Sequence, residues 1–150
     1  MQVGDIMTRD VKTANASDTF ADVARTLHDN RISSVIVMDE GRLAGILTER
    51  DLVNVVAEGV DPREEAVSGR MTRDLATVES RTDISDAAAL MAERGIRHLP
   101  VVDRGELAGI VSIRDLTNWA VSELTGGHEL PDLERSQAAL AAHVEVKRNE

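Results

Sequence analysis

The sequence predicts a mixed α/β (α+β) fold of two tandem β-α-β-β-α units, with two small sheets packed together and the helices outside. Three observations lead to this fold class. The chain repeats itself at an offset of 64 residues, each copy carries apolar residues at helical spacing, and each copy carries two short apolar runs joined by a glycine turn. At 150 residues and 42% hydrophobic content, the chain fits one compact domain or two small ones that share a core.

The repeat aligns residues 7–52 with residues 71–116 without a gap, and 18 of the 46 aligned pairs are identical. The stretch Met7-Thr8-Arg9-Asp10, for example, recurs 64 positions later without a change. So many matches indicate two copies of one structural unit. We therefore predict a first repeat at 1–60, a linker and second repeat at 61–124, and a C-terminal tail at 125–150.

Each copy begins with a short extended segment, which ends at Thr13 or Thr77, and continues into an amphipathic helix. The helix is predicted by apolar residues at i, i+3, i+4 and i+7. These residues are Phe20, Val23, Ala24 and Leu27 in the first copy, and Ile84, Ala87, Ala88 and Met91 in the second. The expected N-caps are Ser17 or Asp18 in the first copy and Thr82 or Asp83 in the second.

Two strands and a second helix complete each copy. The strands are expected at 35–38 and 43–47, and again at 99–102 and 107–111, with glycine in each connecting turn. They are apolar on both faces, so both faces need cover, and we expect the two sheets to pack on each other. The closing helices are expected to open near Thr48 and Ser112.

Residues 57–70 are expected to form the linker, and residues 132–146 either a helix that docks on a partner or a frayed end. No apolar run approaches the roughly 20 residues of a membrane-spanning helix. The N-terminal residues also lack the basic and apolar regions of a secretory signal. We therefore expect a soluble, cytoplasmic protein.

Composition argues against several kinds of chemistry. The chain has no cysteine, which excludes disulfides and thiolate sites, and its net charge of −10 argues against nucleic-acid binding. No P-loop is present, and no pair of histidines has metal-binding spacing. We expect neither catalytic residues nor a metal site. The four histidines are scattered along the chain, at His28, His98, His128 and His143.

The pattern Gly-apolar-apolar-[Ser/Thr]-x-Arg-Asp occurs at both strand–helix junctions, over 45–51 and 109–115. A helix N-terminus offers free N–H groups to a phosphate, and an acidic residue there accepts hydrogen bonds from ribose hydroxyls. The glycine allows a ligand to approach the backbone closely. Equally, Thr48 with Asp51, and Ser112 with Asp115, have the spacing of capping boxes that only satisfy backbone groups. Both interpretations are open at this point.

Together with the opening Met-Thr of each copy and the stretch Ile96–Asp103, these motifs make residues 4–122 resemble a pair of CBS domains, or Bateman module. The resemblance implies a non-catalytic regulatory module that binds AMP, ADP, ATP or S-adenosylmethionine in clefts between the repeats. It further implies a homodimer that acts on a separate, unidentified partner protein. Under it, Asp51 and Asp115 hold the ribose, with Thr48 and Ser112 beside them.

The resemblance implies ligand contacts in the extended segments, at the strand starts and at the helix starts. These residues are Thr13, Ile32, Ser33, Ser34, Thr48, Arg50, Asp51, Thr77, Ile96, Arg97, His98, Pro100, Ser112, Arg114 and Asp115. The copies differ, because Arg97 and His98 replace Ser33 and Ser34, so we expect unequal ligand binding.

Other interpretations stay open for the charged members of this set. For Arg97 the alternative is an ion pair with a surface carboxylate. For His98 the alternative is a role as a packed, hydrogen-bonded residue. Arg50 and Arg114 have the alternative of lying on solvated helix faces. At the level of function, the alternatives are a ligand-free interaction or dimerisation module and a nucleotide enzyme with His98 as its base.

Overall fold

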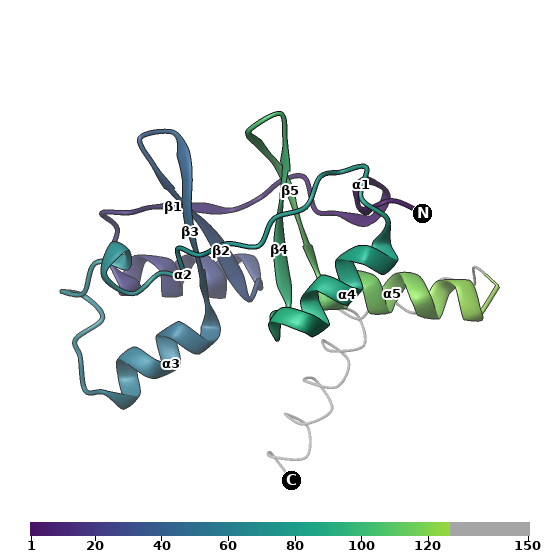
Figure 1. Ribbon diagram of the computed structural model, residues 1–150. Coiled ribbons are helices and arrows are strands. Elements are labelled where there is room, and N and C mark those ends of the chain that lie inside the picture. Colours follow the sequence, from purple (N-terminus) through teal and green to yellow (C-terminus); the bar gives the residue numbers. More distant parts are fainter. Residues whose placement is uncertain (127–150) are drawn as a thin grey trace, which may run out of the picture. The chain divides into compact units, whose positions relative to one another are not determined.

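The computed structural model describes residues 1–126 (Figure 1). Residues 1–116 form one compact unit, and a second unit begins at Thr117. The helix expected within 132–146, and all but the first two residues of the predicted tail, lie outside the described residues.

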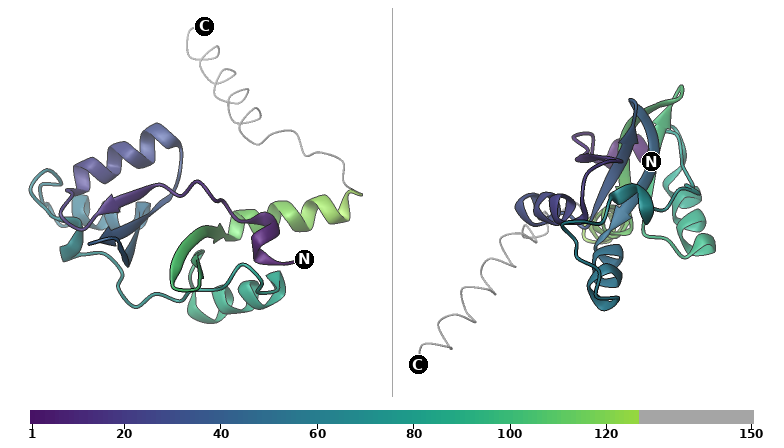
Figure 2. Two further views of the ribbon diagram at one scale, coloured as in Figure 1. Left: turned by 90° about the horizontal axis from the view of Figure 1, so that it is seen from above. Right: turned by 90° about the vertical axis from the view of Figure 1, so that its left-hand side faces the viewer.

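The first repeat contains the five predicted elements in the predicted order. They are β1 (Thr13–Asn15), α2 (Phe20–Asn30), β2 (Ser34–Asp39), β3 (Arg42–Thr48) and α3 (Glu49–Ala57). The sheet order is β1-β2-β3, with β1 parallel and β3 antiparallel to β2. The helices α2 and α3 pack on this sheet and on each other (Figure 2).

The second repeat is one strand shorter than the first. It consists of α4 (Ile84–Arg94), β4 (His98–Asp103), β5 (Glu106–Ser112) and α5 (Ile113–Leu124). The extended segment that precedes α4 contributes a single parallel bridge, between Val78 and Val101, in place of a strand. The mixed α+β architecture with two small sheets is confirmed, and the two sheets contact each other through β3 and β5.

The N-cap of α2 is Thr19, so the expected cap at Ser17 or Asp18 was wrong. The Thr19 N–H donates to Asp22 Oδ2 at 3.0 Å, and the Asp22 N–H donates to Thr19 Oγ1 at 3.2 Å, which forms a capping box. The Asp18 carboxylate instead accepts the Asn15 N–H at 2.8 Å and closes the preceding turn. In the second repeat α4 begins after Asp83, one of the two expected caps.

Both hairpins turn through two residues of positive φ, as the glycine turns predict. The φ angles are 49° at Glu40 and 76° at Gly41, and 52° at Arg104 and 84° at Gly105. Two successive left-handed residues match the twist of the flanking strands and fix their register. That register pairs Ser34 with Thr48 and, in the second repeat, the corresponding residues His98 and Ser112. The hairpins thereby bring the predicted site residues together at the strand ends.

The core is aliphatic, as the composition requires. Phe20, Leu47, Met91 and Leu99 are fully buried, together with valines from both hairpins. Burying one such side chain stabilises the fold by about 1.5–3 kcal/mol. Of the predicted helical stripe, Phe20, Val23 and Leu27 are buried and Ala24 is half-buried, so this periodicity identified the face of α2 that packs inward.

The segment before each repeat packs against the other repeat. A short helix that the sequence did not predict, α1 (Val3–Ile6), lies beside the second repeat (Figure 1), where the Val3 N–H donates to Thr82 O at 2.8 Å. The bridge between Thr8 and Ile110 of β5 continues this contact. The chain then crosses to β1 in the first repeat.

The linker makes the reciprocal contact with the first repeat. It contains a 3₁₀ helix, η1 (Val67–Gly69), whose Val67 N–H donates to Asp18 O at 2.8 Å. Thr72 then forms a bridge with Ile46 of β3, before the chain crosses to the second repeat. We call residues 8–12 and 72–76 the crossing segments.

Glycines 45 and 109 leave room for these crossing segments. The expectation that the two glycines allow a ligand to approach the backbone was therefore wrong. A Cβ built on Gly45 would lie 2.8 Å from both Met71 Sδ and Thr72 O. One built on Gly109 would lie 2.7 Å from Thr8 O. Each strand must lack a side chain at its glycine, because the backbone of the crossing segment passes directly over that position.

Candidate functional site

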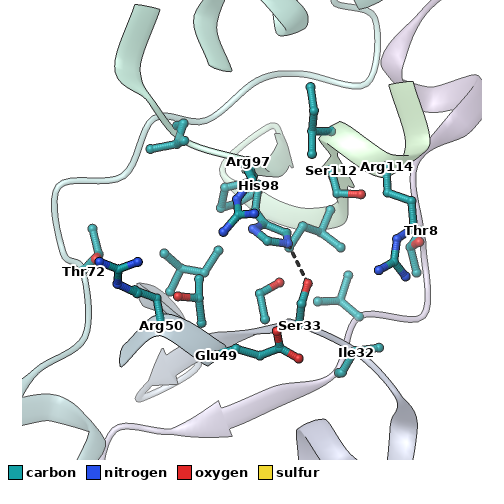
Figure 3. Close-up of a pocket in the computed structure, with 18 of the residues that line it drawn as sticks. Thr8, Ile32, Ser33, Glu49, Arg50, Thr72, Arg97, His98, Ser112 and Arg114 are labelled. Atoms are coloured by element: carbon teal, nitrogen blue, oxygen red, sulfur yellow. Dashed lines mark hydrogen bonds between the residues drawn. The ribbon is translucent and has the colours of Figure 1, made fainter. Parts of the chain in front are cut away.

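A cavity of about 600 Å³ lies between the two repeats, within the unit formed by residues 1–116 (Figure 3). Its volume is within the range of roughly 300–1,000 Å³ that is typical of small-molecule sites. Every lining residue except Pro100 has its counterpart, 64 positions away, in the lining as well. The cavity is therefore built twice from the same part of the repeat, and its two halves are related by the duplication.

Thirteen of the fifteen residues expected to bind a ligand line this cavity. They are Ile32, Ser33, Ser34, Thr48, Arg50, Asp51, Ile96, Arg97, His98, Pro100, Ser112, Arg114 and Asp115. Thr13 and Thr77 are exposed and are not among the lining residues. Their place is taken by the residues just before them, Val11 and Lys12 in one crossing segment and Leu75 and Ala76 in the other.

Fourteen lining residues were missed from the sequence, and eight of them lie in the crossing segments, which were not recognised. They comprise the crossing segments themselves and residues beside the predicted positions. These residues are Thr8, Asp10, Val11, Lys12, Arg31, Ile46, Glu49, Thr72, Asp74, Leu75, Ala76, Gly95, Ile110 and Ile113. The unchanged Met-Thr-Arg-Asp stretch at the start of both copies was a signal for Thr8, Asp10 and their counterparts.

Asp51 and Asp115 form the capping boxes that the sequence allowed. The Thr48 N–H donates to Asp51 Oδ2 at 2.8 Å, and the Ser112 N–H and Oγ both donate to Asp115 Oδ2 at 2.7 Å. Each cap uses only Oδ2, and within residues 1–126 the Oδ1 atom of neither side chain makes a hydrogen bond. Both carboxylates are half-buried at the cavity wall, so the cap leaves one oxygen of each carboxylate available.

A hydrogen bond joins the two repeats across the middle of the cavity. Ser33 Oγ and His98 Nε2 lie 3.0 Å apart, as the dashed line in Figure 3 marks. Burial lowers the pKa of His98 below 6.5, and the positive charge of Arg97 lowers it further, while Asp115 acts in the opposite direction. The imidazole is therefore neutral at pH 7. His98 is thus packed and hydrogen-bonded, which was one of its two interpretations, and it also lines the cavity.

Four arginines, Arg31, Arg50, Arg97 and Arg114, line the cavity without an ion pair among the described residues. In Figure 3, Arg50 lies near Thr72 on one side of the Ser33–His98 bond, and Arg114 lies near Thr8 on the other. Arg97 lies in the middle of the view, beside His98. None of the four guanidinium groups is within 4.0 Å of a carboxylate oxygen in residues 1–126, so Arg97 makes no surface ion pair there. The arginines are therefore free to contact an anion.

Residues 1–126 contain no cluster of three or more His, Cys, Asp or Glu side chains that would hold a metal ion. Over the same range, no helix combines the length and the apolar character needed to cross a bilayer.

Comparison with curated proteins identifies relatives over most of the chain. The CBS domain-containing protein YhcV of Bacillus subtilis is 33% identical over 132 residues, which cover 87% of this chain and 94% of that protein. Protein MK0525 of Methanopyrus kandleri is 38% identical over 119 residues, which cover 77% of this chain. The chain spans about three fifths of the length of that second relative, since the match covers 61% of it.

Solved structures give the same result for the fold. The CBS domain protein PAE2072 of Pyrobaculum aerophilum, complexed with AMP, has a TM-score of 0.73 at 28% identity. The comparison covers 77% of this chain and 90% of that one. The CBS domain pair of protein MJ0100, in complex with 5′-methylthioadenosine and S-adenosyl-L-methionine, has a TM-score of 0.76 at 26% identity. In that case 82% of this chain and 98% of the other are covered.

The model of the CBS domain matches this chain twice, over residues 3–58 and 65–122. The two matches coincide with the two repeats, and together they cover most of the chain. The protein therefore belongs to the CBS domain family, as a tandem pair.

Proposed function

We propose that the chain is a non-catalytic regulatory module that binds an adenosine-type ligand, AMP, ADP, ATP or S-adenosylmethionine, in the cavity between its repeats. The observation that carries the proposal is the duplicated lining, in which a half-buried carboxylate with one unbonded oxygen stands at each strand–helix junction. The ligands of PAE2072 and of the MJ0100 pair, which share this fold, support the choice of an adenosine compound.

In this proposal the parts of the ligand contact different parts of the lining. The purine packs against apolar residues at the strand starts and in the crossing segments, such as Ile32 and Val11 in one half. The ribose hydroxyls donate to Oδ1 of Asp51 or Asp115, which keep their caps through Oδ2. The phosphates accept from the nearby arginine side chains, because the N–H groups of Glu49 and Ile113 at the helix starts already donate to Ser33 O and Arg97 O.

Regulation follows from where the cavity lies. A ligand that contacts both repeats stabilises one arrangement of them relative to others, and a partner protein that recognises this arrangement responds to the ligand. We propose that the module works as a homodimer in the cytoplasm. The exposed apolar residues Val53 and Val56 of α3, at 60% and 70% exposure, support an association surface on that helix.

The proposal is tested by calorimetry and thermal unfolding with AMP, ADP, ATP, S-adenosylmethionine and NAD. A ligand at 100 times its Kd should raise the free energy of unfolding by about 2.7 kcal/mol. We expect Asp51→Ala or Asp115→Ala to abolish or strongly weaken binding while the protein stays folded. Asp22→Ala is the matched control, because it removes the same kind of cap from α2, whose carboxylate is not part of the cavity.

A ligand-free interaction or dimerisation module is the second candidate. It is favoured by the capping bonds of Asp51 and Asp115, which give both residues a structural role without a ligand, and by the exposed valines of α3. Light scattering of the same samples measures the oligomeric state, and ligand binding separates the two functions, because both include a dimer. A dimer that binds none of the five compounds would support the second candidate and contradict the first.

A further inference from the structure

The cavity is nearly symmetric in position but not in charge. Its two walls are residues 31–34 with 48–51, the first-repeat wall, and residues 95–98 with 112–115, the second-repeat wall. Corresponding positions differ in charge at three places, which are Ser33 and Arg97, Glu49 and Ile113, and Arg31 and Gly95. The first two differences make the second-repeat wall more positive and the third makes the first-repeat wall more positive, so the second-repeat wall is the more positive by one charge.

The first-repeat wall carries no net charge. Arg31 and Arg50 are balanced there by Glu49 and Asp51. Glu49 is exposed to the cavity, and within residues 1–126 its carboxylate forms no ion pair. In Figure 3 it lies beside Ser33, across the cavity from Arg97.

The second-repeat wall is positive, because Arg97 and Arg114 are opposed only by Asp115, while His98 is neutral. The crossing segments add no net positive charge to the cavity. In segment 8–12, Lys12 Nζ lies 3.2 Å from Asp10 Oδ2, so the two charges cancel. Segment 72–76 contributes the Asp74 carboxylate to the cavity lining and contributes no cation to it.

We infer that the cavity holds one phosphate-bearing ligand per chain, with its phosphates at Arg97 and Arg114, and that Glu49 is the specificity-determining residue that excludes a second anion. This inference rests on the proposed function, because it concerns how the same cavity divides between two adenosine sites. The duplicated shape provides two places, but the cation at the centre of the cavity, Arg97, comes from the second repeat, since Ser33 stands at the corresponding position of the first.

The dimensions of the cavity make these charges effective. A space of about 600 Å³ is comparable in width to the Debye length of roughly 8 Å at physiological salt. A second phosphate group would therefore lie so close to the first phosphate group and to the Glu49 carboxylate that salt would not screen either repulsion. Like charges at such separations repel each other, whereas uncharged adenosine is repelled neither by a bound phosphate nor by Glu49.

The test compares AMP with adenosine, which lacks the phosphate, by calorimetry on the full chain. Wild type should bind one AMP per chain, and more tightly than adenosine. Arg97→Ser should weaken AMP binding about tenfold and leave adenosine binding unchanged, since it removes a charge-assisted contact to phosphate alone. Glu49→Gln should strengthen AMP binding roughly three- to tenfold or admit a second AMP, and this gain should shrink at high salt.

Two matched variants control for overall charge. Arg94→Ser and Glu93→Gln change the same charges at exposed positions of α4 outside the cavity, and should leave the ratio of the AMP to the adenosine affinity as in wild type. Two AMP molecules per wild-type chain, or a ratio unchanged by both Arg97→Ser and Glu49→Gln, would overturn the inference and leave adenosine binding intact. Failure of wild type to bind either compound would overturn the proposed function and the inference together.

Discussion

His98 is a residue whose protonation is linked to the contact between the repeats. Its imidazole is half-buried, and its Nε2 lies 3.0 Å from Ser33 Oγ of the other repeat. The pKa of His98 is lowered in the folded protein, mainly by burial, so protonation favours the unfolded chain. The stability of the fold is then complete above the unfolded pKa of 6.5, and part of it is lost as the pH falls below that value.

We therefore expect the free energy of unfolding to fall as the pH is lowered from about 7 to about 5. His98→Gln, which keeps a polar side chain but does not titrate, should show a smaller fall over this range. Urea unfolding at several pH values measures the difference. His28→Gln removes an exposed histidine of α2 and should behave like the parent protein. An identical pH dependence in His98→Gln and the parent would contradict this account.

At the level of elements, the same Ser/Thr-x-x-Asp capping box begins α2, α3 and α5, and its surroundings differ among these helices. Asp22 caps α2 outside the cavity, whereas Asp51 and Asp115 cap α3 and α5 at its wall. The bond from the Thr19 backbone N–H lowers the pKa of Asp22, as expected for a carboxylate that accepts an N–H donor. The local chemistry of the three boxes is alike, so only their position separates a purely structural cap from a candidate ligand contact.

Replacing any one of the three carboxylates by alanine should lower the free energy of unfolding by about 1 kcal/mol, because each variant loses one helix cap. Denaturant titration without ligand measures this common effect. Only the Asp51 and Asp115 variants should also lose the ligand-induced stabilisation. If Asp22→Ala lost it equally, the loss would reflect helix fraying and would not indicate contact with the ligand.

At the level of the whole molecule, the segments that precede the two repeats make the repeats depend on each other. Residues 1–8 pair with the second repeat and residues 65–72 with the first, so neither repeat has all of its contacts without the other. Glycines 45 and 109 allow the two passages, where a Cβ would lie 2.7–2.8 Å from the crossing backbone. The same passages bring Thr8 and Thr72 into the cavity lining.

Gly45→Ala and Gly109→Ala should each lower the free energy of unfolding by about 1–3 kcal/mol, because the methyl group must displace the backbone of the crossing segment. Both should also weaken ligand binding, since Thr72 or Thr8 moves with its segment. Gly69→Ala is the control, because a Cβ there meets only the end of the Glu65 side chain, at 3.3 Å. Equal stability of all three variants would contradict the tight passage.

The sequence by itself determined the duplicated unit, the element order of the first repeat and the strand–helix junctions. These features depend on local periodicity and turn chemistry, such as the apolar stripe from Phe20 to Leu27 and the glycine turns, which act over a few residues. The tertiary structure alone decided which repeat each crossing segment contacts, and so placed Thr8 and Thr72 in the cavity and left Thr13 and Thr77 outside it. It also decided that Gly45 admits a neighbouring segment in place of a ligand. The physical reason is that these outcomes depend on which distant backbones fit together in space, and the spacing of residues along the chain carries no record of that fit.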